Sequence, residues 1–295
     1  MKNTIFRGIA TAIITPINEH GIDYERFGAL IDWQIEQGID GLVVCGTTGE
    51  ASTLTIDEHK AVIDFAARHV DGRVPVIAGT GSNETHYAID LTQSAADSGA
   101  DAALVVTPYY NKATQNGLIR FYTEIADTSE IPIILYNVPS RTGMTIEPST
   151  YAALAGHENI VGIKEANGDM SKIVETMALL DGTMDLYSGN DDQLVPLLAM
   201  GASGCISVLS NLLPAETKEI YTRFEAGDVK GAMALQCRYH ELIMALFSEV
   251  SPIPIKAAMS ARGFCDNFLR LPLTTMEPQN ETKLFDAMRK AGIKL

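Results

Sequence analysis

Eight short apolar segments, each followed by a helical pattern, constrain the fold of this chain more than any other feature. They are near-continuous runs of apolar and β-branched residues at 9–16, 41–45, 74–78, 102–107, 131–136, 160–164, 184–188 and 204–208. Runs that do not alternate with polar residues are typical of parallel strands buried on both faces. Their spacing of roughly 20–35 residues leaves room for one helix after each strand.

The helical patterns carry start and stop signals. Thr55 and Glu58 form a capping box ahead of one helical pattern, and an earlier pattern ends at Gly38. A doubly wound sheet also alternates strands and helices, but eight unbroken units favour a closed (β/α)₈ barrel. We expect residues 1–210 to form the barrel that carries the active site. Residues 211–295, where the strands stop, are expected to form a barrel-closing and C-terminal helical appendage.

The charge balance narrows the range of partners. The chain of 295 residues has 37 Asp and Glu against 22 Lys and Arg, a net charge of −15. Nucleic acids and anionic membrane surfaces are bound by basic stripes, so neither is expected as a partner. The four cysteines include no C-x-x-C pair, and no apolar run reaches the roughly 18 residues of a membrane span. We therefore expect a reduced, soluble, cytoplasmic protein.

No metal or organic cofactor is expected either. The six histidines fall mostly in helical or turn segments, and none closes a strand together with a carboxylate. Gly79-Thr80-Gly81 begins like a dinucleotide fingerprint, but the third glycine is missing. The glycine-containing loop at 46–50 lacks the Lys-Ser/Thr ending of a P-loop.

Two neighbouring strands end in reactive side chains. The strand at 160–164 ends in Lys164, and the strand at 131–136 ends in Tyr136. Active sites of such barrels form at the C-terminal strand ends, and adjacent strands lie about 4.8 Å apart, so the two side chains can meet. Burial disfavours an ammonium group, which helps a lysine amine to attack a carbonyl, and a phenol can shuttle the protons. The alternatives are a lysine that reaches the rim or pairs with a carboxylate, and a tyrosine that caps the core.

Other strands also end in polar residues, which we expect at the same C-terminal end of the barrel. Arg141, in a loop after Tyr136, has the guanidinium fork that suits a carboxylate, although it could serve a loop ion pair instead. Thr47 and Thr48, between two glycines, can bind a carboxylate or relay a proton. Tyr109 and the adjacent Tyr110 follow the strand at 102–107.

Taken together, these strand ends closely resemble the dihydrodipicolinate synthase family, among the lysine-dependent class I aldolases typified by N-acetylneuraminate lyase. The resemblance runs from about residue 5 to residue 295 and rests on the motifs Gly46–Glu50, Tyr109–Asn111, Tyr136–Gly143, Lys164–Glu165, Ser188–Asp191 and Ser251–Lys256.

The resemblance implies a reaction and a role for each catalytic residue. Lys164 would form a Schiff base with pyruvate, and the resulting enamine would attack L-aspartate-4-semialdehyde. The product would be 4-hydroxy-tetrahydrodipicolinate, in the first committed step of the diaminopimelate and lysine branch. Tyr136, Thr47 and Tyr110 would form a proton relay. Because the family's counterpart of Tyr110 comes from a neighbouring subunit, a homo-oligomer is implied, and we expect a tetramer built as a dimer of dimers.

The resemblance also assigns substrate contacts. Thr48, Gly189 and the backbone around Ile206 match positions that hold pyruvate, and Arg141 matches the residue that receives the semialdehyde carboxylate. An N-acetylneuraminate lyase or keto-deoxy sugar acid aldolase is the alternative, but these usually lack the Arg-Thr-Gly run found here. A catalytically silent barrel that binds a metabolite is a third reading, which the presence of Lys164 and Tyr136 disfavours.

Feedback inhibition by L-lysine is expected to be weak or absent. Asn83, Tyr109 and His59 match the pocket of lysine-sensitive family members. A second histidine position is Ile56 here and the acidic position is Tyr87, so a bound ammonium group would lose its counter-ion. A cation–π contact recovers only about 0.5–2 kcal/mol, although Glu84 could substitute for the missing carboxylate.

Overall fold

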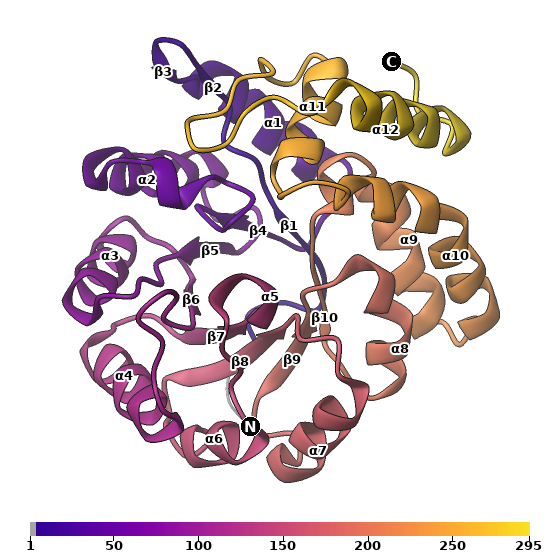
Figure 1. Cartoon of the computed structure of the whole chain (residues 1–295). Helices are drawn as coiled ribbons and strands as arrows, with labels where there is room; N and C mark the ends of the chain where they lie inside the picture. Colours follow the sequence, from indigo (N-terminus) through magenta and orange to yellow (C-terminus); the bar gives the residue numbers. More distant parts are fainter. Residues whose placement is uncertain (1–3) are drawn as a thin grey trace.

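Eight parallel strands close into the barrel that the sequence predicts (Figure 1). The structure, a computed structural model, describes residues 4–295, so residues 1–3 of the expected barrel region lie outside the described residues. Around the barrel the order is β1-β10-β9-β8-β7-β6-β5-β4. The strands are β1 (Gly8–Ala12), β4 (Gly41–Val44), β5 (Val76–Gly79), β6 (Ala102–Val106), β7 (Ile133–Asn137), β8 (Ile160–Glu165), β9 (Asp185–Ser188) and β10 (Gly204–Ser207).

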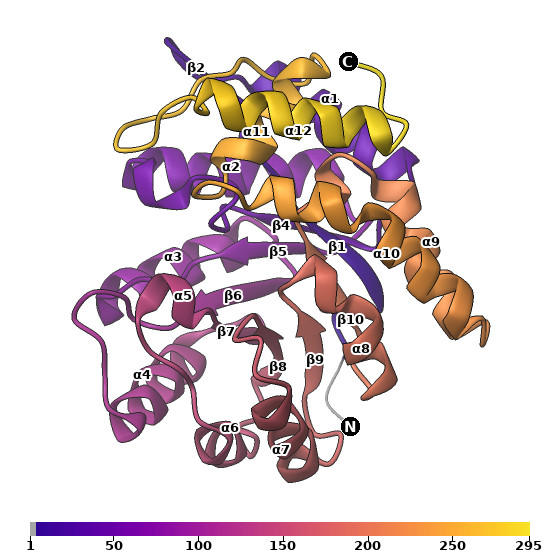
Figure 2. The same ribbon diagram turned by 45° about the vertical axis from the view of Figure 1, so that its right-hand side comes forward.

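Helices surround the strands on every side (Figures 1 and 2). The outer layer contains α1 (Tyr24–Glu36), α2 (Ile56–Val70), α3 (Thr85–Asp97), α4 (Gln115–Thr128), α6 (Pro148–Leu154), α7 (Met170–Leu180), α8 (Leu194–Ala199) and α9 (Pro214–Glu225). The expected capping box at the start of α2 is confirmed, because the side chains of Thr55 and Glu58 cap each other's backbone N–H groups. No helix within residues 4–295 combines the length and apolar character of a membrane span.

The first strand is shorter than the sequence predicts. It ends at Ala12 instead of reaching residue 16, and a small hairpin of β2 (Ile17–Asn18) and β3 (Gly21–Ile22) follows it. Beyond Ala12 the Asn211 side chain replaces the strand ladder. Its Oδ1 accepts from Ile14 N at 3.0 Å, and its Nδ2 donates to Ala12 O at 2.7 Å. The backbone hydrogen bonds at the end of β1 are thus made by a side chain about 200 residues away in the sequence. A local sequence pattern cannot show that the strand ends there.

Side chains of the strands pack into two separate layers. Ile134, Tyr136 and Ile206 belong to the cluster that fills the barrel interior. Ile133, Leu135 and Ile163 belong to a second cluster between the strands and the outer helices. This alternation follows from the two-residue period of a strand, and it decides which strand-end residues reach the barrel mouth.

The C-terminal part adds α10 (Val229–Leu246), α11 (Ile253–Ala261) and α12 (Pro278–Lys290). In both views α12, in yellow, lies beside α1 and α11 (Figures 1 and 2). Lys256 of α11 forms an ion pair with Glu50, and both side chains are completely buried. Glu50 ends the loop after β4 in a left-handed conformation, with φ of 58°. The ion pair therefore ties the C-terminal helices to a loop at the barrel mouth.

The buried ion pair predicts a large loss of stability in Lys256→Met. The substitution leaves the Glu50 carboxylate buried without its cation, which costs about 3–5 kcal/mol of unfolding free energy. Urea unfolding measures this loss. Lys290→Met is the matched control because Lys290 pairs with Glu241 on the surface, where both side chains are more than half exposed and a pair is worth about 1 kcal/mol or less. Equal losses in the two variants would contradict the prediction.

Candidate active site

Lys164 and Tyr136 lie side by side at the C-terminal ends of β8 and β7. The two residues are register partners in the parallel ladder. The Lys164 Nζ lies 4.2 Å from the centre of the Tyr136 ring. Only 7% of each residue's surface is exposed. The structure thus holds an amine and a phenol together in a largely buried position at the C-terminal end of the barrel.

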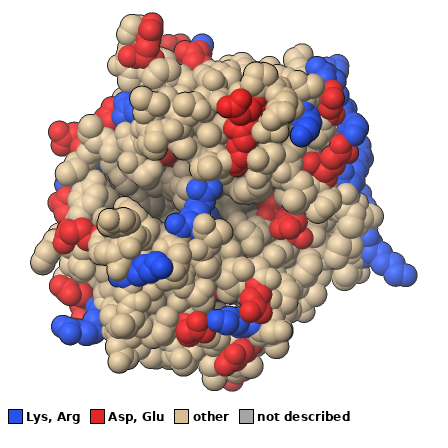
Figure 3. Space-filling view, in the orientation of Figure 1, with Lys and Arg blue, Asp and Glu red and all other residues tan. Residues whose placement is uncertain are grey.

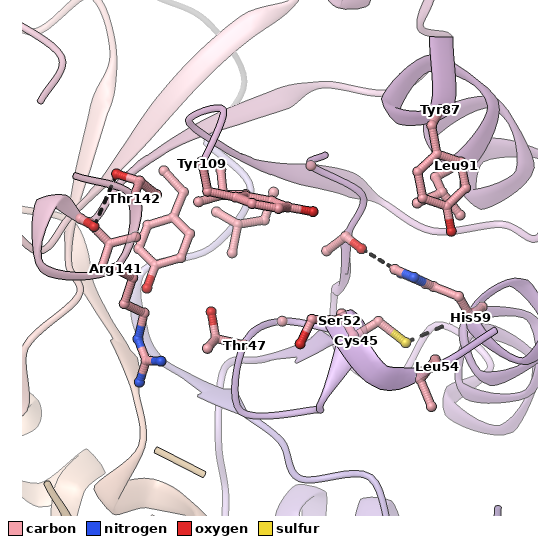
Figure 4. A pocket seen from close by; sticks show the side chains of 18 residues that line it. Cys45, Thr47, Ser52, Leu54, His59, Tyr87, Leu91, Tyr109, Arg141 and Thr142 are labelled. Carbon is pink, nitrogen blue, oxygen red and sulfur yellow. Dashed lines mark hydrogen bonds between the residues drawn. The ribbon is translucent and has the colours of Figure 1, made fainter. Parts of the chain in front are cut away.

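A cavity of about 400 Å³ opens beside Tyr136, and Lys164 lies behind the Tyr136 ring without itself lining the cavity. Its lining includes Thr47, Tyr136 and Arg141. In Figure 4 the Arg141 guanidinium and the Thr47 side chain lie toward the same side of the cavity. Figure 3 shows basic side-chain atoms in the hollow of this face, although the chain as a whole carries a net charge of −15. An anionic substrate therefore meets local positive charge at this cavity.

Arg141 lies on a short helix, not in the loop that the sequence predicts. The helix α5 (Pro139–Thr142) starts with Pro139 and is followed by Gly143, whose φ of 69° is left-handed. Proline at the first position and a left-handed glycine after the last are both favourable helix-end signals, but four residues are too few to show a helical period. The Arg141 Nη2 donates to the Ser251 carbonyl at 3.2 Å, so the C-terminal region also holds this side chain.

The loop after β4 contains two adjacent threonines whose side chains have different environments. Thr47 is exposed to the cavity, whereas Thr48 is 4% exposed. Successive backbone bonds, from Gly49 N to Gly46 O at 3.1 Å and from Glu50 N to Thr47 O at 3.2 Å, turn the loop tightly. A Cβ on Gly79 of β5 would overlap the Cys45 carbonyl, so a glycine at this position lets the two strand ends approach.

The other predicted substrate contacts surround the same mouth. Ile206 is completely buried in β10, inside the barrel. The Gly189 N–H donates to the Glu165 carbonyl at 2.7 Å. A Cβ on Gly189 would lie 2.8 Å from the Ala166 Cβ, which requires the neighbouring chain to move.

Asp191 is a residue of the site that the sequence indicates only through the motif Ser188–Asp191. Its carboxylate is 5% exposed and accepts hydrogen bonds from Ser207 Oγ, from Val208 N at 3.0 Å and from Leu209 N at 2.9 Å. Burial raises the pKa of Asp191, while these hydrogen bonds and the positive charge of Lys164 oppose the rise. Asp191 fixes the backbone just after Ile206. An acidic residue three positions after the end of an apolar strand is the signal that the sequence offers for it.

Tyr110 does not join the cavity of its own chain. Its side chain is 92% exposed and its φ is 67°, whereas the adjacent Tyr109 lines the cavity. A left-handed backbone is unfavourable for a bulky residue and costs of order 1–3 kcal/mol. Of the predicted catalytic residues, Tyr110 is the one that neither lines the cavity nor contacts Lys164 and is instead almost fully exposed.

The far end of the cavity contains His59 and Tyr87, two of the residues expected to affect lysine binding, whereas Ile56 and Asn83 do not line the cavity. His59, Leu54, Tyr87 and Leu91 face one another there (Figure 4). The His59 Nε2 lies 2.8 Å from the Gly79 carbonyl, and burial lowers the pKa of the imidazole while this contact opposes the effect. None of these four side chains carries a carboxylate.

Residues 4–295 contain no group of three or more His, Cys, Asp or Glu side chains that could hold a metal ion. What the mouth does contain is a buried amine beside a phenol, with a guanidinium at the same cavity. A (β/α)₈ barrel with this arrangement at its C-terminal face is an enzyme of the imine-forming class I aldolase type.

Comparison with known proteins gives the family. The model of the dihydrodipicolinate synthetase family matches residues 5–291. The chain is 50% identical to the 4-hydroxy-tetrahydrodipicolinate synthase of Alkaliphilus oremlandii over 289 residues, 98% of this chain and 100% of that protein. The chain therefore belongs to the dihydrodipicolinate synthetase family.

Solved structures agree with this membership. The chloride-inhibited dihydrodipicolinate synthase of Acinetobacter baumannii, complexed with pyruvate, is 45% identical and covers 99% of this chain and 100% of its own, with a TM-score of 0.95. The enzyme of Cyanidioschyzon merolae, with lysine bound, is 36% identical and has the same coverage and TM-score.

Proposed function

We propose that the chain condenses pyruvate with L-aspartate-4-semialdehyde to form 4-hydroxy-tetrahydrodipicolinate. The observation that carries this proposal is the contact between Lys164 and Tyr136 at the cavity mouth. The names of the related proteins favour this reaction over that of an N-acetylneuraminate lyase or keto-deoxy sugar acid aldolase. The product belongs to the diaminopimelate and lysine branch.

The proposed chemistry uses the residues at the cavity mouth. The Lys164 amine attacks the ketone carbon of pyruvate, and loss of water leaves an imine. The imine lowers the cost of removing a methyl proton, and the resulting enamine attacks the aldehyde carbon of the second substrate. The amino group of that substrate then attacks the imine carbon and displaces the Lys164 amine, which closes the ring of the product and frees the lysine. Tyr136 and Thr47 carry protons to and from the oxygen atoms that change charge. Thr48, Gly189 and the backbone around Ile206 hold pyruvate.

Reduction of the imine tests the role of Lys164. Pyruvate with borohydride should add one reduced pyruvyl group per chain, detectable by intact-mass analysis, because only a buried amine beside a proton donor forms the imine readily. Peptide mapping should place the group on Lys164, and Lys164→Ala should remain unmodified. Modification of a different lysine would refute the assignment.

Arg141 is proposed to bind the carboxylate of the semialdehyde. Its guanidinium lines the cavity and is held by Ser251 instead of an acidic side chain. In Arg141→Ala, loss of a charged hydrogen bond of about 1.5–3 kcal/mol should raise KM for the semialdehyde roughly 10- to 150-fold. The KM for pyruvate should change much less. Steady-state kinetics with each substrate varied decides this, and equal increases in both KM values would exclude the role.

We further propose that Tyr110 completes the proton relay of a neighbouring subunit, within a tetramer built as a dimer of dimers. Support comes from its exposure of 92%, its left-handed backbone and its absence from its own cavity. A second copy of the chain would bury the ring and offset the strain.

Complementation between two inactive variants tests this arrangement. Tyr110→Ala keeps Lys164 but lacks the relay tyrosine, and Lys164→Ala has the opposite defect. After refolding together, mixed dimers should contain one complete site, and activity should recover to roughly a quarter of the wild-type value. Each variant refolded alone is the control. A mixture with no more activity than its components would show that Tyr110 acts within its own chain or not at all.

Inhibition by L-lysine is proposed to be weak or absent, because Ile56 and Tyr87 stand where lysine-sensitive family members have a histidine and an acidic side chain. We expect initial rates to stay nearly constant when the L-lysine concentration is raised to about ten times a typical enzyme KM, which lies between micromolar and millimolar. Tyr87→Glu should gain inhibition, since it restores a carboxylate beside His59. Half-maximal inhibition of the unaltered protein below millimolar lysine would contradict the prediction.

The proposed reaction takes place in the cytoplasm and requires no metal or cofactor, because the imine itself withdraws the electrons. The thiols of Cys45, Cys205, Cys237 and Cys265 are all free, which fits a reducing compartment. We also propose that residues 1–210 carry the reacting groups, while residues 211–295 position them through Ser251 and Lys256.

A further inference from the structure

A second pair of side chains lies directly behind the catalytic pair. Asn137 follows Tyr136, Glu165 follows Lys164, and the two are also register partners in the β7–β8 ladder. Because side chains alternate along a strand, Tyr136 points into the barrel while Asn137 and Glu165 point toward the outer helices. The exposed fractions of Asn137 and Glu165 are 0% and 2%.

Four hydrogen bonds converge on the Glu165 carboxylate, and all four use it as an acceptor. Asn137 Nδ2 donates to both oxygens at 2.9 and 3.2 Å, the Tyr151 hydroxyl donates at 2.9 Å, and Asn167 N donates at 2.9 Å. The same Asn137 accepts from Ile146 N at 3.1 Å. The carboxylate thus joins β7 and β8 to α6 and to the segments that flank α5 and α7.

We propose that Glu165 is a positioning residue that holds the ends of β7 and β8 together through Asn137, and that it must be ionised to do so. The inference rests on the proposed function, because the positioned groups are Tyr136 and Lys164. A protonated Glu165 would direct its O–H at Asn137 Nδ2 or Asn167 N, which can only donate, or at the Tyr151 hydroxyl, which would then have to stop donating to the carboxyl. It would lose the bond to Asn137 or to Tyr151, and the catalytic pair would lose its support from behind.

The charge state of Glu165 changes in the physiological pH range. Burial raises the pKa of this carboxyl to about 7, although its hydrogen bonds oppose the rise. The titratable groups that the outer helices place near the Glu165 carboxylate are phenols and not cations. Tyr151 of α6 contacts the carboxylate, and Tyr122 of α4 lies behind Tyr151. Burial raises the pKa of both phenols well above 10, so both stay protonated. Among residues 4–295, no lysine, arginine or histidine forms an ion pair with Glu165.

The pH dependence of kcat tests the proposal. With an ionisation near pH 7, the wild-type enzyme should be about tenfold faster at pH 8 than at pH 6, because the ionised fraction rises by that factor. Glu165→Gln should lower kcat at both values and lose this dependence on pH. Tyr151→Phe removes one hydrogen-bond donor to the carboxylate and so destabilises its ionised form. The acid limb, which is the fall of kcat toward low pH, should therefore move to higher pH by roughly one pH unit or more.

Tyr122→Phe is the matched control, since Tyr122 is an equally buried tyrosine whose hydroxyl contacts the Val105 carbonyl at 3.4 Å instead of Glu165. Its acid limb should stay in place. If Glu165→Gln does not fold, the comparison of Tyr151→Phe with Tyr122→Phe still decides. An active wild type whose pH dependence is the same in all the folded variants would overturn this inference alone. An inactive wild type would refute the proposed function instead.

Discussion

The in-register pairing of β7 with β8 is the constraint on which the site depends. It matches Tyr136 with Lys164 and, one residue later, Asn137 with Glu165. The two-residue period of a strand sends the first pair into the barrel and the second toward the helices. A slip of one residue would place the reactive amine in the helical layer and a carboxylate in the barrel. In the proposed reaction, the reacting groups and the groups that support them thus come from consecutive residues of the same strands.

The C-terminal helices complete the site at a distance. The Ser251 carbonyl accepts a hydrogen bond from the Arg141 guanidinium. Lys256 forms an ion pair with Glu50, at the end of the loop that contains Thr47 and Thr48. Both contacts come from one short stretch of chain at the start of α11. Because a buried charge without a partner is costly, Lys256 and Glu50 are coupled strongly, and the position of the loop depends on helices that supply no reacting group.

Local pattern was enough to predict the barrel and the neighbours Lys164 and Tyr136, since near-continuous apolar runs mark buried parallel strands and the strand order fixes which ends adjoin. It failed where distant residues decide. Asn211 ends β1 by bonding to Ala12 and Ile14, and Asp191 holds the end of β10 through Val208 and Leu209. The helix around Arg141 is too short to show a period. Tyr110 is exposed with a left-handed backbone, and its proposed role in a neighbouring subunit came from the family resemblance, because no pattern within one chain indicates it.

A crystal structure of the protein soaked with pyruvate tests the central claim most directly, because it shows which atom the substrate joins. Continuous electron density is expected from the Lys164 Nζ to the ketone carbon, with Tyr136 beside the new bond and the carboxylate at Thr48. Pyruvate bound in the cavity without a bond to Lys164, or joined to another lysine, would contradict it.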